Sequence, residues 1–424
     1  MVWWIIYDFL VIPLGWVAFQ IFRLIDPKVR RGIRGRKDLF CNLQTNVGRL
    51  PGNTRRIWFH SSSMGEFEQA KPIIAELKKR NPSVEIVVSF FSPSGYEHAG
   101  AYKPADIITY LPFDSSRNAE RFVSLVRPSA AVMVRYDLWP NHLRALQRAK
   151  IPIFIANATL RQNSARSLPL AKQFHRAVYN SLDYILTVSE SDKRMFESFD
   201  LNHPLVDVMG DTRYDQVWQR SADSKTHHYL PASVIDGKKL LVVGSSWQED
   251  EDELFPAVRK LVAVYPDLLV ILVPHEPNME TLERIEYRLN AQISSIRFSM
   301  LSDYNNERLI IIDSVGILMA LYQYAHVAYV GGSFRQGVHN VLEPAAYGIP
   351  LVIGPKHENS QEALKLIASG AAFVGTNAEE LYRQFRMLIE NDEPRRRAGQ
   401  DALEFVRRNV GATKRFLSYL ERVL

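Results

Sequence analysis

Residues 57–66 read IWFHSSSMGE and join a short apolar run to a serine-rich turn and an acidic residue. The run at 57–60 has the β-branched and aromatic side chains of a buried strand. Apolar residues over 67–77 then recur at helical spacing, and Asn81-Pro82 marks the end of that helix. A strand followed by a crossover helix is the repeating unit of a parallel sheet, so this stretch predicts an α/β fold.

Short apolar runs alternate with amphipathic stretches along the rest of the chain. In the first half we expect strands at 57–60, 84–90, 107–111, 131–134, 153–156, 184–188 and 206–209. In the second half we expect strands at 240–243, 268–273, 309–312, 327–330, 351–353 and 372–374, with helices such as 250–265 and 317–324. This alternation indicates doubly wound parallel sheets, which a polar stretch at 218–239 divides into two Rossmann-like domains.

The pattern predicts five segments. They are a hydrophobic segment with a basic flank at 1–37, a first Rossmann-like domain at 38–215, a linker at 216–236, a second Rossmann-like domain at 237–400, and an amphipathic helix at 401–424. We expect this last helix to pack back across the cleft between the domains. In such sheets ligands bind beyond the carboxyl ends of the strands, so the residues that follow the strands are the informative ones.

The composition of the 424 residues is that of a globular protein, with 46% hydrophobic and 23% charged residues. Its one cysteine, Cys41, excludes an intramolecular disulfide framework and fits a reducing compartment. The net charge of +6 is modest for this length, and we expect no nucleic-acid partner. The positive charge is concentrated in residues 28–37, which hold Lys28, Arg30, Arg31, Arg34, Arg36 and Lys37.

The basic cluster follows the most hydrophobic segment, residues 2–22. This segment has about the length of a bilayer span, with tryptophans that suit an interface, although Asp8, Pro13 and Gln20 interrupt it. It predicts a membrane anchor, and a buried helix of the first domain is the alternative. The basic residues would then lie on the cytoplasmic side and hold anionic head groups, or else form a solvated linker helix.

Glu66 is the first candidate catalytic residue. It opens the predicted helix after the first strand, where free backbone N–H groups favour anions and Gly65 allows a close approach. A carboxylate here can be a general base if an acceptor hydroxyl comes within hydrogen-bond reach. Ser63 and Gly65 would then contact that acceptor. A helix-capping glutamate explains the same residue equally well.

The run at 330–355 (VGGSFRQGVHNVLEPAAYGIPLVIGP) is the candidate nucleotide cradle. It combines a glycine turn after a strand, a predicted helix that begins near Val341, and a second buried strand. Glu343 can accept hydrogen bonds from the two hydroxyls of a ribose. The candidate donor contacts in this run are Gly331, Gly332, Ser333, His339, Asn340 and Glu343. A tight turn with a capped helix is the alternative.

Three further groups follow predicted strands. Ser245 and Ser246 are candidate phosphate contacts, or helix caps. His275, at the start of His-Glu-Pro, is a weaker candidate for the donor base or phosphate. Arg135, Asp137 and Trp139 follow the strand at 131–134 and suit a sugar or a phosphate, or else a helix cap beside a buried tryptophan.

The sequence lacks the motifs that are typical of several other kinds of active site. No set of His, Cys and Asp has the spacing of a zinc site, and neither a Walker lysine motif nor a nucleophile elbow occurs. The absence of Gly-x-Gly-x-x-Gly argues against a dinucleotide oxidoreductase. We therefore expect no metal and no cofactor.

Together these residues resemble the 3-deoxy-D-manno-octulosonic acid (Kdo) transferases of lipopolysaccharide synthesis, which are GT-B glycosyltransferases. The resemblance covers nearly the whole chain. It rests on the hydrophobic N-terminus, residues 63–66 (SMGE), 137–141 (DLWPN) and the run at 331–355. Further landmarks are residues 91–96 (FSPSGY), 111–114 (LPFD) and 210–213 (GDTR).

The resemblance implies transfer of Kdo from CMP-Kdo to a lipid A precursor (lipid IVA), with inversion at the anomeric carbon. It implies that Glu66 is the catalytic base, with Asp137 also in the catalytic site. It places the donor mainly on the second domain and the acceptor on the first. We expect the enzyme at the inner membrane, with its catalytic domains facing the cytoplasm.

Two positions depart from the family pattern. Many members carry Glu where this chain has Arg135, and many carry Arg-His where it has His275-Glu276. These departures concern acceptor-side and donor-side contacts respectively, and leave Glu66 unchanged. Two rival functions stay open: a GT-B enzyme that uses a UDP-sugar on a lipid-linked acceptor, and a catalytically silent GT-B-like binding protein.

Overall fold

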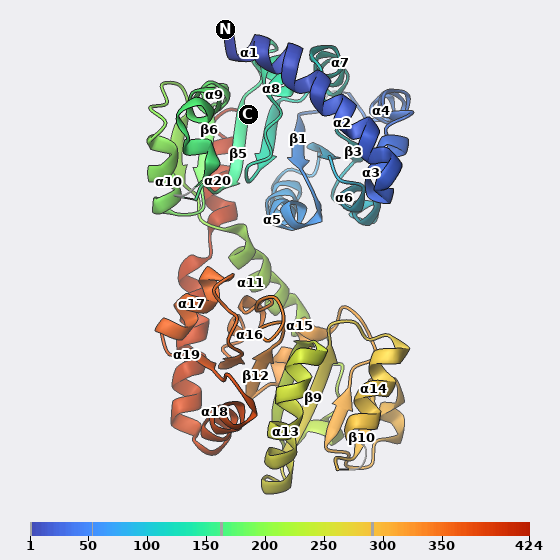
Figure 1. Ribbon diagram of the computed structural model, residues 1–424, viewed down its shortest axis with the longest axis vertical. Helices are drawn as coiled ribbons and strands as arrows, with labels where there is room; N and C mark the ends of the chain where they lie inside the picture. The colour runs from blue at the N-terminus through green and yellow to red at the C-terminus, as the bar shows by residue number, and fades with distance from the viewer. Residues whose placement is uncertain (1, 53, 162–163, 290–291) are drawn as a thin grey trace. The chain divides into compact units, whose positions relative to one another are not determined.

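Two parallel sheets carry the fold, one in each of two units (Figure 1). The computed structural model describes residues 2–52, 54–161, 164–289 and 292–424. One unit comprises Met1–Gln216 with Val410–Leu424, and the other comprises Val217–Asn409. The predicted class, an α/β protein with two Rossmann-like parallel sheets, is confirmed.

In the first unit, seven strands of the described chain form a sheet in the order β3-β2-β1-β4-β5-β6-β7. They are β1 (Arg56–Ser61), β2 (Glu85–Phe90), β3 (Ile107–Tyr110), β4 (Ala130–Val134), β5 (Ile153–Ala158), β6 (Tyr184–Thr187) and β7 (Leu205–Val208). Strand β1 pairs in parallel with both β2 and β4, so the strand order reverses beside β1. The loops after β1 and β4 therefore open side by side, where doubly wound sheets bind ligands.

The second unit repeats this arrangement with the order β10-β11-β9-β8-β12-β13-β14. Its strands are β8 (Lys239–Ser246), β9 (Leu268–Pro274), β10 (Ser295–Arg297), β11 (Leu309–Ile311), β12 (Val327–Val330), β13 (Leu351–Ile353) and β14 (Ala372–Val374). Strand β8 lies between β9 and β12, so the loops after β8 and β12 meet at the reversal point. Every predicted strand is present, and among the strands of the described residues only the edge strand β10 was missed.

The described helices after the N-terminal segment pack beside both sheets and connect their strands (Figure 1). They are α3 (Pro27–Gly35), α4 (Leu39–Gly48), α5 (Met64–Arg80), α6 (Pro93–Ala99), α7 (Ser116–Val126), α8 (Pro140–Arg148), α9 (Pro169–Tyr179), α10 (Glu190–Glu197), α11 (Thr212–Ser224), α12 (Ala232–Ile235), α13 (Gln248–Val264), α14 (Met279–Leu289), α15 (Leu318–Leu321), α16 (Leu342–Ala345), α17 (Gln361–Ala368), α18 (Ala378–Glu390), α19 (Asp392–Asn409) and α20 (Ala412–Leu420). Helix α5 illustrates why the sequence forms a helix here. A capping box begins it at Ser63, and its apolar residues Phe67, Ile74 and Leu77 are fully buried in the core beside β1.

The C-terminal region is not one helix, contrary to the prediction for 401–424. Helix α19 ends at Asn409, and α20 begins after Gly411, whose φ of 112° is a conformation that L side chains rarely adopt. The carboxylate of Asp215 accepts hydrogen bonds from the backbone N–H groups of Gly411 (2.5 Å) and Thr413 (2.6 Å), which fixes the start of α20. Phe416 and its neighbours on α20 are buried in the core of the first unit.

The segment predicted as a linker, 216–236, is largely helical. Most of α11 lies in it, and α12 follows after a short turn. Polar composition suggested a connection without structure, but α11 has one buried stripe, including Val217 and Ser221, and needs few apolar residues to pack.

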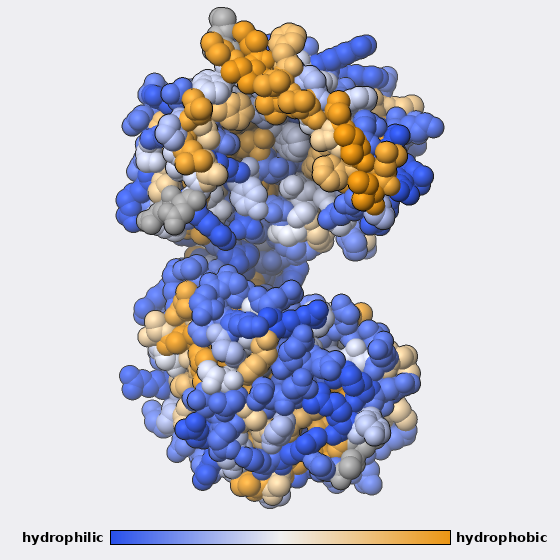
Figure 2. All heavy atoms as spheres, viewed as in Figure 1, coloured by the Kyte–Doolittle hydropathy of each residue, from blue (hydrophilic) through white to orange (hydrophobic). Residues whose placement is uncertain are grey.

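The apolar N-terminal segment is helical from Val2 to Ile25, with α1 (Val2–Ile6), a π-helical stretch (Tyr7–Val11) and α2 (Ile12–Ile25). It is the one helix of the described chain that is long and apolar enough to cross a membrane. Most of its large side chains are exposed, and Figure 2 shows them as a continuous hydrophobic band.

One side of this N-terminal helix is attached to the first unit. Tyr7 donates a hydrogen bond to the buried carboxylate of Asp114 (2.8 Å), and Asp8 forms an ion pair with Arg144 (2.7 Å). Phe19 packs edge-on against Phe113 with ring centroids 5.2 Å apart. Asp8 therefore has an ionic partner on α8. Its charge is compensated inside the protein, so it does not argue against a helix at the membrane interface.

The basic cluster is smaller than the sequence indicated. Arg36 does not contribute to a charged surface, because its guanidinium donates to the backbone oxygens of Gly32, Phe91 and Leu111. Its carbon Cζ also lies 4.7 Å from the centroid of the Phe91 ring. Burial lowers the pKa of Arg36 to about 10, so it stays charged as a structural clamp.

Candidate active site

Glu66 lies at the reversal point of the first sheet, in the first turn of α5. Its Oε2 accepts hydrogen bonds from the backbone N–H of Ser63 (3.1 Å) and from the Ser63 hydroxyl. These bonds form the capping box that was the alternative explanation for this residue. They also hold the carboxylate in one orientation, and Oε1 accepts no hydrogen bond from the residues that the structure describes.

Space beside Glu66 is left open by Gly65. A Cβ atom at Gly65 would meet only the Ser63 hydroxyl, at 3.8 Å. Glu66 itself is only 8% exposed, so water reaches it from a limited direction. A small substrate group can therefore approach the turn closely, and the predicted roles of Ser63 and Gly65 as acceptor contacts fit this space.

Asp137 lies on the neighbouring loop, after β4. Its Oδ2 is 2.7 Å from Nε2 of His60 and 3.2 Å from Nε1 of Trp139. Burial alone would raise the pKa of Asp137, but hydrogen bonds from His60, Trp139 and Ser62 outweigh it and lower this pKa. Asp137 is therefore an ionised hydrogen-bond acceptor at neutral pH and does not supply a proton.

His60 is a site residue that the sequence analysis missed. It is fully buried at the end of β1, and its Nδ1 lies 2.8 Å from the hydroxyl of Ser89, which accepts a hydrogen bond from Trp58. Because a carboxylate can only accept, Nε2 of His60 donates to Asp137. The sequence did hold a signal for this residue, because His60 is the one polar residue of the apolar run at 57–60.

Arg135 is held in a left-handed backbone conformation (φ 66°) directly after β4. Its guanidinium carbon lies 5.5 Å from the ring centroid of Tyr136, and that of Arg166 lies at the same distance from this ring. Two cations therefore flank one half-exposed aromatic ring beside Asp137. Sequence reasoning identified Arg135 but not Arg166, which comes from a distant loop.

In the second unit, four predicted donor contacts line one pocket of about 320 Å³: Ser245, His339, Asn340 and Glu343. Arg220 and Tyr322 complete its polar lining. The pocket opens at the reversal point between β8 and β12, as expected for a doubly wound sheet.

Glu343 is the acidic group of this pocket. Asn340 donates a hydrogen bond to its Oε1 (3.0 Å). Burial raises the pKa of Glu343, while the bond from Asn340 and the charge of Arg220 oppose that shift. A partly desolvated carboxylate with few internal partners suits the vicinal hydroxyls of a ribose.

The glycine turn does not form the predicted phosphate cradle. The N–H of Gly332 donates to the buried carboxylate of Asp250 (2.7 Å), and the Ser333 hydroxyl accepts from the N–H of Gly354 (2.7 Å). Gly331 is needed because a Cβ there would lie 2.2 Å from the carbonyl oxygen of Ser245. These three residues shape the pocket from within the protein.

The structure changes two further predictions for this region, one for the helix near Val341 and one for Ser246. The helix predicted near Val341 is the single turn α16, so it has little dipole to offer a phosphate. Ser246 is buried and donates its hydroxyl hydrogen bond to Glu251 (3.1 Å), whereas Ser245 is partly exposed and lines the pocket.

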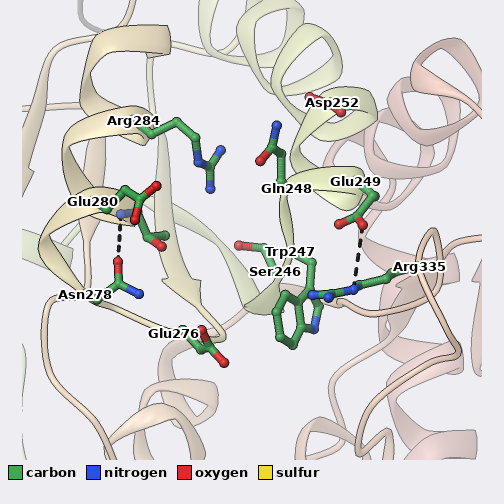
Figure 3. Close-up of a pocket in the computed structure, with 11 residues that line it drawn as sticks. Ser246, Trp247, Gln248, Glu249, Asp252, Glu276, Asn278, Glu280, Arg284 and Arg335 are labelled. Atoms are coloured by element: carbon green, nitrogen blue, oxygen red, sulfur yellow. Dashed lines mark hydrogen bonds and ion pairs between the residues drawn. The ribbon is translucent and has the colours of Figure 1, made fainter.

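His275 belongs to a stack of rings next to this pocket. Its centroid lies 4.4 Å from that of Trp247 and 4.6 Å from that of His339. Trp247 lines a second pocket of about 520 Å³ (Figure 3). Figure 3 shows Arg284 and Arg335 at this pocket together with several carboxylates, and Arg335 pairs with Glu249 (3.6 Å).

Among the described residues, no three His, Cys, Asp or Glu side chains are grouped so that they could hold a metal ion. The donor set of the 320 Å³ pocket, with one carboxylate, one amide and one imidazole, suits the hydroxyl and phosphate groups of a nucleotide.

Residues 41–216 match the family model described as 3-deoxy-D-manno-octulosonic-acid transferase (kdotransferase). The chain is 28% identical over 384 residues to the 3-deoxy-D-manno-octulosonic acid transferase of Haemophilus influenzae, covering 86% of this chain and 87% of that protein. It is 27% identical over 351 residues to the transferase of the same name from Chlamydophila psittaci, covering 82% and 80%.

Among solved structures, the UDP-GlcNAc 2-epimerase from Neisseria meningitidis bound to UDP-GlcNAc has a TM-score of 0.61. The comparison covers 87% of this chain and 100% of the epimerase, at 16% identity, and shows a shared fold.

The two parallel-sheet units have a GT-B-like fold, and the matches to Kdo transferases indicate a glycosyltransferase. The chain is similar to the Kdo transferases. The family model matches residues 41–216, and the similarity to the two transferases extends over most of the chain.

Proposed function

We propose that this protein transfers Kdo from CMP-Kdo to a lipid A precursor (lipid IVA) in lipopolysaccharide core synthesis, with inversion of the anomeric carbon. The match of residues 41–216 to the Kdo transferase family carries the proposal. The oriented carboxylate of Glu66 at the reversal point of the first sheet gives it a chemical basis.

In the proposed reaction, Glu66 accepts the proton of an acceptor hydroxyl through its free oxygen Oε1. The hydroxyl oxygen attacks the anomeric carbon of Kdo from the face opposite the phosphate, and a new glycosidic C–O bond forms. The bond from that carbon to the phosphate oxygen breaks, and CMP leaves with the electron pair. One bond forms and one breaks on opposite faces, so the configuration inverts.

Residues around Asp137 suit the acceptor. Asp137 is held ionised and can accept a hydrogen bond from an acceptor hydroxyl, and Trp139 beside it offers an apolar surface. Arg135 lies on the same loop, and with Arg166 it supplies the cations that a phosphorylated sugar requires. The departure from the family at Arg135 therefore adds positive charge on the acceptor side.

The 320 Å³ pocket suits the donor nucleotide. We assign the ribose hydroxyls to Glu343, and the phosphate to Ser245, His339 and Asn340. His275 borders this pocket through its stack with His339. Gly331, Gly332, Ser333 and Ser246 support the pocket from behind. Neutral hydrogen-bond donors can stabilise the departing CMP, and the proposal includes no metal or cofactor.

The N-terminal helix suits a lipid acceptor. Its exposed apolar side chains, including Phe9, Leu14 and Ile21, face away from the first unit, to which Tyr7 and Asp8 attach it. We propose that this helix lies in the interface of the inner membrane, with the catalytic units on the cytoplasmic side. The basic residues that follow on α3 would contact anionic head groups.

The first test is transfer from CMP-Kdo to the lipid A precursor, read by mass spectrometry of the lipid. Wild type is expected to add at least one Kdo mass, and Glu66→Ala to lose at least about 100-fold in rate while staying folded, as is typical of a lost general base. Glu76→Ala on the same helix, where the side chain only pairs with Arg80, is the matched control. Equal rates for wild type and Glu66→Ala would contradict the assigned base.

Competition by nucleotides tests the donor. CMP is expected to inhibit transfer and to bind more tightly than UDP. Tighter binding of UDP, with transfer from a UDP-sugar, would replace the donor assignment by the rival GT-B function. A folded wild type that binds a nucleotide but transfers no sugar from either donor class would instead support the silent binding protein.

A further inference from the structure

Trp247, His275 and His339 come from three separate loops and form one stack beside the donor pocket. Trp247 follows β8, His275 follows β9, and His339 precedes α16. The rings of His275 and His339 are nearly parallel, with an interplanar angle of 12°. Only His339 of these three lines the 320 Å³ pocket, whereas Trp247 lines the 520 Å³ pocket.

A hydrogen bond within the stack fixes the proton of His339. Nε1 of Trp247 lies 2.7 Å from Nε2 of His339. An indole N–H can only donate, so Nε2 of His339 must present its lone pair. A neutral imidazole with an accepting Nε2 carries its proton on Nδ1, and no described residue is bonded to that nitrogen.

The surroundings also keep this ring in place. A Cβ atom at Gly332 would lie 2.7 Å from Cδ2 and 2.9 Å from Nε2 of His339, so this edge of the ring is packed against the glycine turn. Trp247 is held in turn by the guanidinium of Arg335, whose carbon lies 3.9 Å from the centroid of the indole ring system. The edge with Nδ1 is the one left for a ligand.

We propose that Trp247 is a positioning residue that holds His339 as a neutral Nδ1–H donor for the phosphate of the donor nucleotide. The identity of the ligand rests on the proposed function, whereas the tautomer of His339 does not. The indole N–H never touches the nucleotide in this arrangement. Its effect reaches the phosphate only through the imidazole.

The charged groups around His339 agree with a neutral ring. Burial, and next the neighbouring His275, lower the pKa of His339, while Asp250 on α13 opposes this shift. From the other elements, Arg335 faces the indole, and Arg220 and Glu343 line the same pocket. Protonation of His339 would also place an N–H against the N–H of Trp247, so the hydrogen bond must break first.

The tautomer is tested directly by ¹⁵N NMR of histidine-labelled enzyme in the absence of any nucleotide, with His339→Asn to assign the signal. The expected spectrum at pH 7.5 has a protonated Nδ1 and an unprotonated Nε2 for His339. In Trp247→Phe, which keeps an aromatic ring in the stack, we expect the two tautomers to exchange. A protonated Nε2 in the wild type would overturn the proposal.

The functional test measures CMP affinity by calorimetry for wild type and Trp247→Phe. At pH 8 the variant is expected to bind CMP about 3- to 10-fold more weakly, the range of one net hydrogen bond. As the pH falls this ratio is expected to shrink, because in the variant a protonated His339 donates from Nδ1 without help from Trp247. Titration of the CMP phosphate affects both proteins alike and cancels in the ratio.

A double-mutant comparison separates positioning from a general structural role. With His339→Asn already present, Trp247→Phe is expected to change CMP affinity less than about 2-fold, because there is no imidazole left to orient. An equal loss in both backgrounds, or a ratio independent of pH, would overturn the proposal. If wild type binds no CMP, the assigned donor fails, and the NMR result still decides the tautomer.

Discussion

At the scale of single residues, the two candidate sites depend on polar groups that the protein itself has oriented. Ser63 orients Glu66, His60 orients Asp137, and Trp247 orients His339. The sequence predicted Glu66 and Asp137 because they follow strands, and His339 because it lies just before a predicted helix. It could not predict their partners His60 and Trp247, since bonds between separate loops have no local sequence pattern.

Gly332→Ala is expected to damage the donor pocket. The residue has a φ of 90°, and an added Cβ would lie 2.5 Å from the carbonyl oxygen of Gly337 and against the ring of His339. We expect a loss of about 2–4 kcal/mol in the free energy of unfolding, together with weaker CMP binding. Gly370→Ala is the control, because Gly370 has a similar φ of 78° with no atom within 4 Å of the added Cβ. It should lose only about 1–2 kcal/mol, with CMP binding unchanged.

His60→Phe is expected to make stability depend on pH in a defined direction. The pKa of Asp137 is lowered in the fold, so its carboxylate stabilises the protein above the ordinary carboxyl range and loses this contribution as the pH falls through the folded pKa. Without His60, burial dominates and the pKa of Asp137 rises. The variant should therefore be less stable by about 2 kcal/mol at neutral pH, and the deficit should shrink towards pH 4.5.

Thermal melting between pH 7.5 and 4.5 measures this difference. His203→Phe provides the control, because His203 forms an exposed pair with Asp183 (3.2 Å), and such pairs contribute little. A deficit of His60→Phe that stays constant over this pH range would contradict the assigned role of Asp137.

At the scale of elements, continuous apolar runs were predicted best. Strands β12 and β13 have the predicted bounds, because each is a fully buried run between turn residues. Strand β10 was missed because three half-buried residues at a sheet edge carry almost no signal. The helix predicted to begin near Val341 is present but forms only one turn, Leu342–Ala345.

The N-terminal helix yields a prediction at this scale. Replacing the exposed Leu10 and Leu14 by Lys is expected to leave the first unit folded, because neither side chain is buried in it. Binding to vesicles with anionic lipids should fall at least about 10-fold, since each buried leucine contributes about 1.5–3 kcal/mol. Flotation of the vesicles measures the bound fraction.

Tyr287→Lys in the second unit is the matched control. This side chain is 89% exposed and lies far along the chain from the N-terminal helix, so vesicle binding should stay unchanged. Equal binding by wild type and the Leu10 and Leu14 double variant would show that the apolar band does not contact lipid.

At the scale of the whole molecule, base and donor pocket belong to different units, so their defects should separate. Glu66→Ala is expected to lose turnover while its CMP affinity stays within about 2-fold of wild type. Glu343→Ala should bind CMP at least about 10-fold more weakly, because a charged hydrogen-bond partner contributes about 1.5–3 kcal/mol. Calorimetry with CMP, beside the transfer assay, checks both. Weak CMP binding by Glu66→Ala would place Glu66 in the donor site instead.

The last fifteen residues, Val410–Leu424, return to the first unit, and α20 buries Phe416, Leu417 and Leu420 in its core. During synthesis this core must therefore wait until residues 410–424 have been translated, whereas Val217–Asn409 is one uninterrupted segment that can fold earlier. A nascent chain stalled anywhere before residue 410 leaves the apolar faces of α5 and β5 uncovered. The half of the enzyme that is translated first is thus the half that is completed last.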